Sequence, residues 1–431
     1  MIQRLRARVF YGWWMVASGM GIQLLISGLL NQSYGTYVVL LREDFGWSKT
    51  ALSGAYSLQQ VESGLLGPVQ GWIIDKFGPR PVMRVGVTLL GVGFMLMSLV
   101  HSLPAFYGAF FIMALGASLS GFFPLTVAVV NWFRRFRSFA ISTMSTGFAA
   151  GGLMVPIVAF SMEEFGWRST AFASGILVLM VGLPLVQVIR RRPEDQGDVV
   201  DGIREPAPVE GAPVIRVAAS GERDFTLKEA VRTPAFWFIS LGHGSALLIV
   251  TAVQVHVVSH LKDGLGYSLG GAAQVYTLMT IAQITGMVVG GLIGDRYDKR
   301  LIAFACMGMH TAGLLLVAHA TMTLMVMGFA VLHGFAWGCR GPLMQAIRAD
   351  YFGRTNYGVI MGWSSMIVMI GTIAGPLVAG ILADVTGSYQ SGFTVLAILA
   401  GMGSGFFLLS KRPTLPDDTE PRVEPQAAGA L

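Results

Sequence analysis

The chain has 431 residues, of which 53% are hydrophobic and only 13% are charged, and its mean hydropathy is +0.62. A soluble globular protein carries about 25% charged residues, so the composition excludes that class and predicts a protein of the lipid bilayer. The net charge of +6 does not indicate nucleic-acid binding, because the basic residues lie at the edges of apolar segments and form no patch.

The first apolar segment, residues 11–40, is long enough for a retained membrane span and has no signal-peptide cleavage pattern. Four polar residues recur on it in steps of four, four and three, which places them on one helix face: Gln23, Ser27, Asn31 and Tyr34. The stripe indicates the wall of a polar cavity. Hydrogen bonds between helices of one bundle are the alternative.

The second predicted span, residues 50–74, contains Glu62, the only acidic residue deep inside any predicted span. It lies 13 residues before Asp75, which corresponds to roughly 20 Å of helix. Glu62 is therefore expected near the middle of the bilayer. Four further spans complete the first half of the chain: 85–100, 104–131, 139–160 and 168–189.

Residues 193–233 are rich in Pro, Gly and charge and predict a flexible cytoplasmic loop that ends in a short amphipathic helix. This loop separates an N-terminal six-helix bundle, residues 1–192, from a C-terminal one, residues 234–411. The tail, residues 412–431, is expected to be disordered and cytoplasmic. The second half of the chain contains six predicted spans: 234–261, 270–294, 300–318, 321–347, 358–382 and 388–410.

The two halves repeat each other at an offset of 220 positions. "FGWS" at 45–48 recurs as "LGYS" at 265–268, "GWIIDKFGPR" at 71–80 as "GLIGDRYDKR" at 291–300, and "GGLMVPIVA" at 151–159 as "GTIAGPLVA" at 371–379. Span seven also repeats the polar face of span one, with His243, Thr251 and Gln254 at the matching positions. The sequence therefore predicts an all-α membrane protein with twelve transmembrane helices in two six-helix pseudo-symmetric bundles.

Lysine and arginine gather on one side of these spans, and the other side has only Arg42, Lys49, Arg168 and Lys262. The positive-inside rule then predicts a multi-pass protein of the cytoplasmic (inner) membrane with both termini in the cytoplasm. One basic residue lies at neither edge of the membrane. Arg340, in "AWGCRGPLMQ", lies ten residues before Asp350, roughly 15 Å inside the membrane edge.

Three explanations of Arg340 are open. Its guanidinium presents a fork of donors that matches a carboxylate, so it could bind an anionic substrate. It could instead pair with Glu62, or satisfy backbone carbonyls next to Gly341 and Pro342. The first two explanations are compatible, since protonation of Glu62 would release Arg340 for an anion. An arginine at the centre of a membrane helix costs at least ~2.5–3.5 kcal/mol, so a functional role is expected.

The stretch "GWIIDKFGPR" resembles the signature of the major facilitator superfamily between its second and third spans, a Gly, three residues, an Asp, a base, a Gly and a further base. The matching residues are Gly71, Asp75, Lys76, Gly78 and Arg80 in the first copy, and Gly291, Asp295, Arg296 and Arg300 in the second. The resemblance implies the major facilitator fold, a pathway lined by spans one, four, seven and ten, and a motif that latches helix ends in one access state.

Three other stretches resemble the branch of monocarboxylate transporters and oxalate–formate antiporters: "FYGWWMV", "TLKEAVRTPAFWF" and "ADYFGRTNYGVIMG". That branch often has an Asp and an Arg in span eight, where this chain has Gln283 and Met287. The resemblance implies a small organic anion as the cargo.

We therefore expect a secondary transporter for a small organic anion, with a monocarboxylate as the expected cargo, that works by alternating access and proton symport. The expected substrate-binding residues are Arg340, Glu62, Gln23, Asn31, Tyr34, His243, Thr251, Gln254, Gln283 and Trp337, and Glu62 is also the expected proton-coupling residue. A carrier of a zwitterionic or cationic solute, an anion exchanger and a membrane sensor are the alternatives. The expected protein is a monomer with no catalytic constellation, cofactor, metal or nucleic-acid partner.

Overall fold

The computed structural model describes residues 9–47, 49–203 and 224–414, and within them the chain is helical. Twelve spans can be followed. Those of the first half are α2 (Tyr11–Ile26) with η1 (Ser27–Asn31) and α3 (Tyr34–Phe45); α4 (Lys49–Leu65) with α5 (Gly67–Phe77); α6 (Pro79–Ser98); α7 (Leu103–Ser120) with α8 (Phe122–Trp132); α9 (Arg137–Ala150) with η2 (Gly151–Met154) and the start of α10 (Val155–Leu177); and the rest of α10 with η3 (Val178–Gly182) and α11 (Leu183–Val188).

The second half has fewer breaks. Its six spans are α13 (Pro234–Ser259) with η6 (His260–Gly264), α14 (Leu269–Gly294), α15 (Lys299–Ala318), α16 (Thr323–Phe352), α17 (Tyr357–Thr386) and α18 (Tyr389–Leu409). Before α13 the chain forms η4 (Glu194–Gln196), η5 (Val200–Gly202) and α12 (Leu227–Ala230). The short helix predicted at the end of the linker is α12, which starts with a capping box between Thr226 and Glu229. The rest of the predicted flexible loop, 204–223, and the tail from 415 lie outside the described residues.

Nine helices in the described part of the chain are long and apolar enough to cross a bilayer by composition alone. One of these, Arg137–Val188, contains two spans, because Gly166 breaks α10 with φ 77° and ψ 152°. The remaining two spans, α4–α5 and α16, are not among the nine. These two spans are also the ones that contain Glu62 and Arg340.

Several helices begin where a side chain can replace a missing backbone partner. Ser102, Thr233 and Ser268 precede α7, α13 and α14, and each accepts a hydrogen bond from a backbone N–H in the first turn. A proline at the start of α6, α7 and α13 also favours the beginning of a helix there, because it fixes a helical φ where no N–H is needed. The observed starts of α7, α13 and α14 lie within one residue of the predicted starts at 104, 234 and 270, whereas α6 begins at Pro79, before the predicted start at 85.

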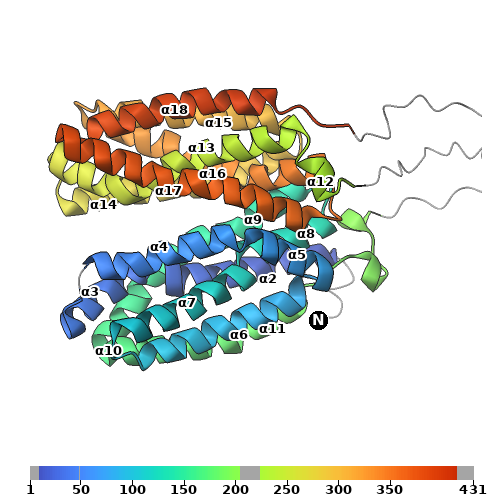
Figure 1. Ribbon diagram of the computed structural model, residues 1–431, viewed down its shortest axis with the longest axis horizontal. Helices are drawn as coiled ribbons and strands as arrows, with labels where there is room; N and C mark the ends of the chain where they lie inside the picture. Colours follow the sequence, from blue (N-terminus) through green and yellow to red (C-terminus); the bar gives the residue numbers. More distant parts are fainter. Residues whose placement is uncertain (1–8, 48, 204–223, 415–431) are drawn as a thin grey trace, which may run out of the picture.

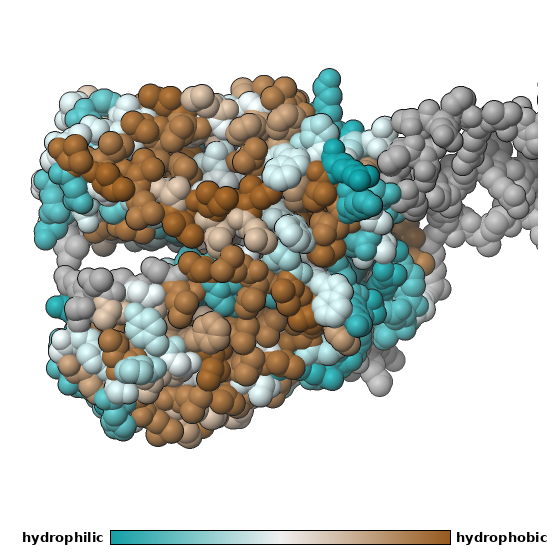
Figure 2. All heavy atoms as spheres, viewed as in Figure 1, coloured by the Kyte–Doolittle hydropathy of each residue, from teal (hydrophilic) through white to brown (hydrophobic). Residues whose placement is uncertain are grey.

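The helices form two bundles, each with its own apolar core. One core comprises residues from α2 to α11 together with Ala346, Ala349, Tyr357 and Met361, which α16 and α17 contribute at the closed end, and the other comprises residues from Phe225 to Phe407. Figure 1 shows the bundles lying side by side, close together near α5, α8, α9 and α12 and diverging toward α3 and α14. Figure 2 shows a hollow between the bundles at the diverging end and many apolar side chains over the face in view, as lipid contact requires. We call the two ends the closed end and the open end.

Candidate functional site

Arg340 lies on α16 inside the C-terminal bundle, and its side chain is completely buried. None of its three guanidinium nitrogens has a hydrogen-bond partner among the described residues. There is open space beside the next residue, Gly341, since a Cβ added there would meet no atom within 4 Å. A buried guanidinium without partners costs free energy, so its presence calls for a binding partner.

The groups near Arg340 belong to its own bundle. It lies within electrostatic range of Cys306, Cys339 and Arg348, and it acts in the same way on His243, His310 and His333. Glu62 is not among these neighbours, and no ion pair within the described part of the chain joins it to Arg340. The pairing that sequence reasoning left open is therefore not formed in this conformation.

Glu62 is also buried, with 5% of its surface exposed, on α4 of the N-terminal bundle. Its Oε2 accepts a hydrogen bond from Ser63 Oγ at 3.1 Å, and its Oε1 has no partner among the described residues. Two positions further along, Gly64 touches the side chain of Met369 on α17. α4 therefore meets the opposite bundle two residues after Glu62.

A second buried arginine was not identified from the sequence. Arg348 is 3% exposed and donates to Ser364 Oγ at 3.0 Å, to Met344 O at 2.9 Å and to His243 Nδ1 at 3.0 Å. In the sequence it appears among the bases of the membrane edge. The one feature of the sequence that could indicate its burial is its position two helical turns after Arg340, which brings both side chains into the same bundle.

Most of the predicted polar stripe is engaged within the bundles. Tyr34 donates to Leu52 O at 2.6 Å, Thr251 donates to Leu247 O and Thr372 O, and Asn31 accepts from Gln59 at 3.3 Å. His243 accepts from Arg348, as described above. Gln23 and Gln283 are buried, Trp337 is half-buried and Gln254 is exposed. The structure therefore brings few of these residues to an open surface, and several make the helix-to-helix bonds that were the alternative.

The repeated motif residue Asp75 joins the two bundles at the closed end. Its carboxylate accepts from the backbone N–H of Gly358 at 3.1 Å and of Val359 at 2.8 Å. These are N–H groups of the first turn of α17, which have no partner within their own helix. The negative charge also lies at the positive end of that helix.

Asp295 makes the same contact in the opposite direction. Its carboxylate accepts from Ser138 N at 2.7 Å and from Phe139 N at 3.0 Å, in the first turn of α9. Each of these residues lies 220 positions from its counterpart in the first contact. Burial raises the pKa of Asp295 above its ordinary value of 3.8, while the N–H donors of Phe139 and Ser138 oppose the shift.

Close approach of α5 and α17 makes the first contact possible. A Cβ at Gly71 would lie 2.2 Å from Gly358 O, so only glycine fits. The bases of the motif bond inside their own bundles. Lys76 Nζ lies 4.7 Å from the centroid of the Trp72 ring, and Arg80 donates to Gln187 at 3.0 Å.

The remaining motif residues follow the same pattern. Arg300 pairs with Asp298 and Arg296 is exposed, while Gly78 has a φ of 84° at the turn between α5 and α6. The carboxylates and glycines therefore make the cross-bundle contact. Lys76, Arg80 and Arg300 make their contacts within their own bundles.

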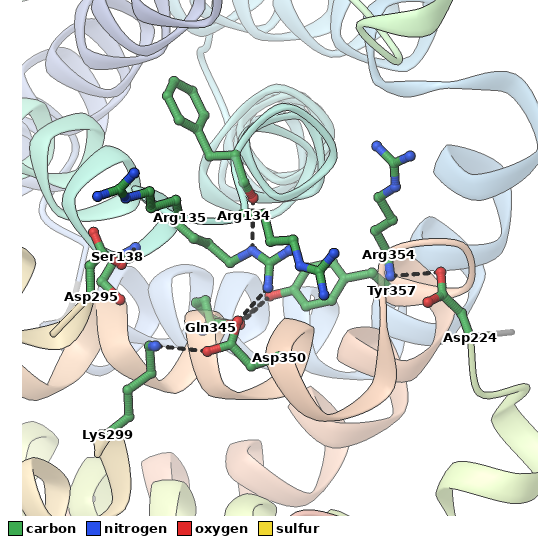
Figure 3. Close-up of polar contacts among 12 residues, drawn as sticks. Arg134, Arg135, Ser138, Asp224, Asp295, Lys299, Gln345, Asp350, Arg354 and Tyr357 are labelled. Carbon is green, nitrogen blue, oxygen red and sulfur yellow. Dashed lines mark hydrogen bonds and ion pairs between the residues drawn. The ribbon is translucent and has the colours of Figure 1, made fainter. Parts of the chain in front are cut away.

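An ion pair that sequence reasoning missed also crosses between the bundles. Arg137 NH1 pairs with Asp350. The second carboxylate oxygen of Asp350 lies 2.7 Å from Lys299 Nζ, as Figure 3 shows. Arg137 has 7% and Asp350 has 31% of its side chain exposed. The sequence placed both residues at a membrane edge, and only the packing of α9 against α16 brings them together.

The two ends of the linker dock on equivalent loops. Asp201 accepts from Arg134 N at 3.1 Å and Arg135 N at 2.8 Å. Asp224 accepts from Arg354 N at 3.0 Å and Thr355 N at 2.8 Å, and the Arg354–Asp224 contact is visible in Figure 3. Arg354 also pairs with Glu194, so a side chain of the C-terminal bundle binds the linker next to the other bundle.

These features define a class of protein. Two helical bundles with apolar outer faces, joined at one end by reciprocal hydrogen bonds and separated at the other, with unpaired charges in their interior, form a polytopic membrane carrier. The sequence profile of the Major Facilitator Superfamily matches residues 20–271 and 240–429. The chain therefore belongs to the Major Facilitator Superfamily, and it is a transporter, not an enzyme.

Individual relatives agree with this family. The chain is 26% identical to monocarboxylate transporter 13 of Bos taurus, over 95% of this chain and 93% of the relative. It is 25% identical to the oxalate:formate antiporter of Oxalobacter formigenes, over 80% of each chain. Among solved structures, the proton:xylose symporter XylE has a TM-score of 0.73 at 13% identity, covering 93% of this chain and 95% of that chain. The predicted resemblance to the monocarboxylate transporter and oxalate–formate antiporter branch is confirmed.

Proposed function

We propose that this transporter moves a small organic anion, with a monocarboxylate as the expected cargo, by alternating access coupled to protons. The observation that carries the proposal is the buried guanidinium of Arg340, whose three nitrogens have no partner among the described residues. A carboxylate would supply two acceptor oxygens in the geometry that guanidinium prefers. The names of the relatives, a monocarboxylate transporter and an oxalate:formate antiporter, support the same cargo.

The arrangement of the bundles supports alternating access. The closed end holds the basic loops that the positive-inside rule assigns to the cytoplasm. The conformation is then outward-facing, in the cytoplasmic (inner) membrane, with both termini inside and a monomer as the transporting unit. Release of the anion inside requires the four bonds of Asp75 and Asp295 to break and the open end to close.

Glu62 is our candidate for the proton-coupling residue. It is a buried carboxyl on α4, with one oxygen unpartnered among the described residues. The same unpartnered oxygen favours a second candidate function, transport of a zwitterion whose cationic group binds Glu62. Competition of uptake by carboxylates and by betaine-like compounds separates the two, and counterflow from anion-loaded vesicles distinguishes an exchanger from a proton symporter.

The decisive experiment is uptake into proteoliposomes, with pyruvate, oxalate and benzoate as labelled substrates after a thermal-shift screen of organic acids. Arg340→Gln should lower uptake at least ~30-fold, because a bound carboxylate left without its charged partner loses ~2 kcal/mol or more. Arg340→Lys should retain part of the activity, since it keeps the charge but not the fork. Arg42→Gln, an exposed charge at the open end, is the control and should transport normally.

A folded, inserted Arg340→Gln protein with full uptake would refute the role of Arg340. If no carboxylate is transported by the unchanged protein and betaine-like compounds are, the zwitterion carrier is the correct assignment.

A further inference from the structure

Two histidines that the proposed transport mechanism does not use form a pair in the interior of the C-terminal bundle. His310 lies on α15 and His333 on α16, and neither side chain is exposed. Their Nδ1 atoms are 3.1 Å apart, and their ring centroids are 4.6 Å apart at an interplanar angle of 67°. Two imidazoles at this distance share one hydrogen, so one Nδ1 donates and the other accepts.

The other nitrogen of each ring is available. Neither Nε2 has a hydrogen-bond partner among the described residues. In the neutral pair, the ring that donates through Nδ1 has a bare Nε2, and the ring that accepts has an Nε2–H. One added proton on the bare Nε2 would therefore leave the bond between the rings intact. The pair has the geometry to accept one proton without rearrangement.

Arg340 is the charged group that acts on both rings. It lies two turns after His333 on α16, and long helical side chains extend toward the N-terminus of the helix, in this case toward His333. The other titratable groups around Arg340 are Cys306, Cys339, Arg348 and His243, none of which is a carboxylate. The helices α14 and α18, which pack on α16 and α15, have no acidic or basic residue.

We propose that the His310–His333 pair is a proton-binding site whose occupancy is linked to an anion at Arg340. The inference rests on the proposed binding of a carboxylate by Arg340. With Arg340 unneutralised, a proton on the pair would add a second positive charge to a dry interior. A carboxylate bound to Arg340 removes that penalty. Anion and proton then bind cooperatively, and each increases the affinity for the other by the same factor.

The step is a simple proton balance. The pair takes one proton from water when the anion binds and returns it when the anion leaves, and no covalent bond other than N–H forms or breaks. The protonated pair has both Nε2–H groups and the shared Nδ1 hydrogen. Because the site lies in the C-terminal bundle, it is separate from Glu62 on α4, and the two sites can be tested independently.

The first test measures proton uptake on anion binding. The purified full-length protein is mixed at neutral pH with pyruvate, oxalate or benzoate in weak buffer with a pH-indicator dye, and binding is followed in parallel by calorimetry. These acids are ionised at neutral pH and supply no proton. We expect uptake approaching about one proton per bound anion in the unchanged protein. Uptake should be lost in a His310→Asn, His333→Asn double variant that still binds.

The matched control is His319→Gln, which replaces an exposed histidine that contacts Thr394 outside the cluster. It should behave as the unchanged protein. Anion binding with the same proton uptake in the double variant would overturn the inference and leave the proposed function intact. If none of the three anions binds the unchanged protein, the proposed function fails, and the second test still decides on the pair.

The second test needs no ligand. Arg340→Gln removes the charge that an anion would neutralise. Unfolded histidines take up protons below about pH 6.5, and a pair that stays neutral when folded loses stability as the pH falls. The melting temperature of the unchanged protein should therefore fall more steeply between about pH 7.5 and about pH 5.5 than that of Arg340→Gln. Adding the two His→Asn substitutions should abolish the difference.

Equal slopes for the unchanged protein and Arg340→Gln would overturn the linkage. If the double variant does not insert, the single variants His310→Gln and His333→Gln give the same readout, because either one removes the proton-sharing pair.

Discussion

At the scale of single residues, the two interior charges are separate in this conformation. Arg340 has its electrostatic neighbours in the C-terminal bundle, and Glu62 has one carboxylate oxygen bonded to Ser63. A carrier that held the two charges together would have to break that pair to bind a substrate. In the observed arrangement both are available at once, so an anion and a proton can be bound by different bundles.

The role of Glu62 leads to a prediction about coupling. Glu62→Gln keeps the size and the hydrogen-bonding ability of the side chain but cannot release or bind a proton near neutral pH. We expect uptake driven by a pH gradient to fall at least ~10-fold, while exchange of internal for external substrate continues. Uptake with and without a gradient, and counterflow, should be measured in the same vesicles. Unchanged gradient-driven uptake would show that the coupling proton binds elsewhere.

The sequence could predict that Arg340 and Glu62 are buried, because each lies inside a long apolar segment and far from either edge of the membrane. It could not predict that Arg348 is buried, since this residue lies only two positions before Asp350, where a linear reading places the membrane edge. It also could not tell a cavity wall from helix-to-helix contacts. Tyr34 and Thr251 lie on the predicted face, but both bond to carbonyls of adjacent helices.

At the scale of helices, the contact between α5 and α17 depends on glycine. Gly71→Ala would place a Cβ against the carbonyl of Gly358, a backbone atom that cannot move out of the way. We expect the closed end to be destabilised by ~1–3 kcal/mol, the usual cost of overpacking. Electron–electron distances between spin labels at Arg135 and Tyr297 should lengthen.

The control for this variant is Gly35→Ala on α3, where an added Cβ meets no atom within 4 Å. It should leave the label distances unchanged. Distances in Gly71→Ala equal to those of the unchanged protein would mean that the helices can separate slightly without opening the closed end.

The contact between Asp295 and α9 predicts a pH dependence with a definite sign. Burial raises the pKa of Asp295 above 3.8 while the closed end is formed, and an opened end would return the carboxyl to water and to its ordinary pKa. The conformation with the higher proton affinity gains population as the pH falls. Lowering the pH toward the ordinary carboxyl pKa of 3.8 should therefore favour the closed end. The fraction of molecules with the short distance between spin labels should then increase.

Asp295→Asn has no carboxyl to titrate and should remove this part of the pH response. A response of the same size in Asp295→Asn would assign it to other groups. The helix ends involved were predictable from the repeated motif, but the partner helices were not. Nothing in a linear sequence says that the carboxylate after one helix caps a helix of the other half.

At the scale of the whole molecule, an ion pair supplements the backbone contacts. Arg137 and Asp350 join the bundles, and Asp350 is 31% exposed, so water screens the pair. A double-mutant cycle with Arg137→Ala and Asp350→Ala should give a coupling of about 1 kcal/mol, or about a fivefold change in the ratio of closed to open conformations. The spin-label distances again supply that ratio.

The comparable pair Arg168–Asp44 lies within the N-terminal half and serves as the control cycle. It should leave the ratio unchanged. Strictly additive effects of Arg137→Ala and Asp350→Ala would show that each residue acts through its other contacts, Phe133 O and Lys299 respectively.

The overall architecture was accessible from the sequence because three independent patterns agreed, namely apolar runs, the sided distribution of bases and the offset of 220. The conformation was not, because carriers of this architecture change state largely by rigid-body movement of one bundle against the other, which leaves the patterns within each bundle unchanged. Only contacts between bundles, such as those of Asp75 and Asp295, distinguish the states.

Those two contacts have the form of an isologous interface, in which patch i of one unit binds patch j of the other and the reverse also holds. Asp75 binds Gly358 and Val359, and Asp295 binds Ser138 and Phe139, each at its duplicated position. Such reciprocity is typical of a two-fold homodimer, and in this protein the two units belong to one polypeptide. We therefore expect the two halves, produced as separate chains, to associate through these same contacts.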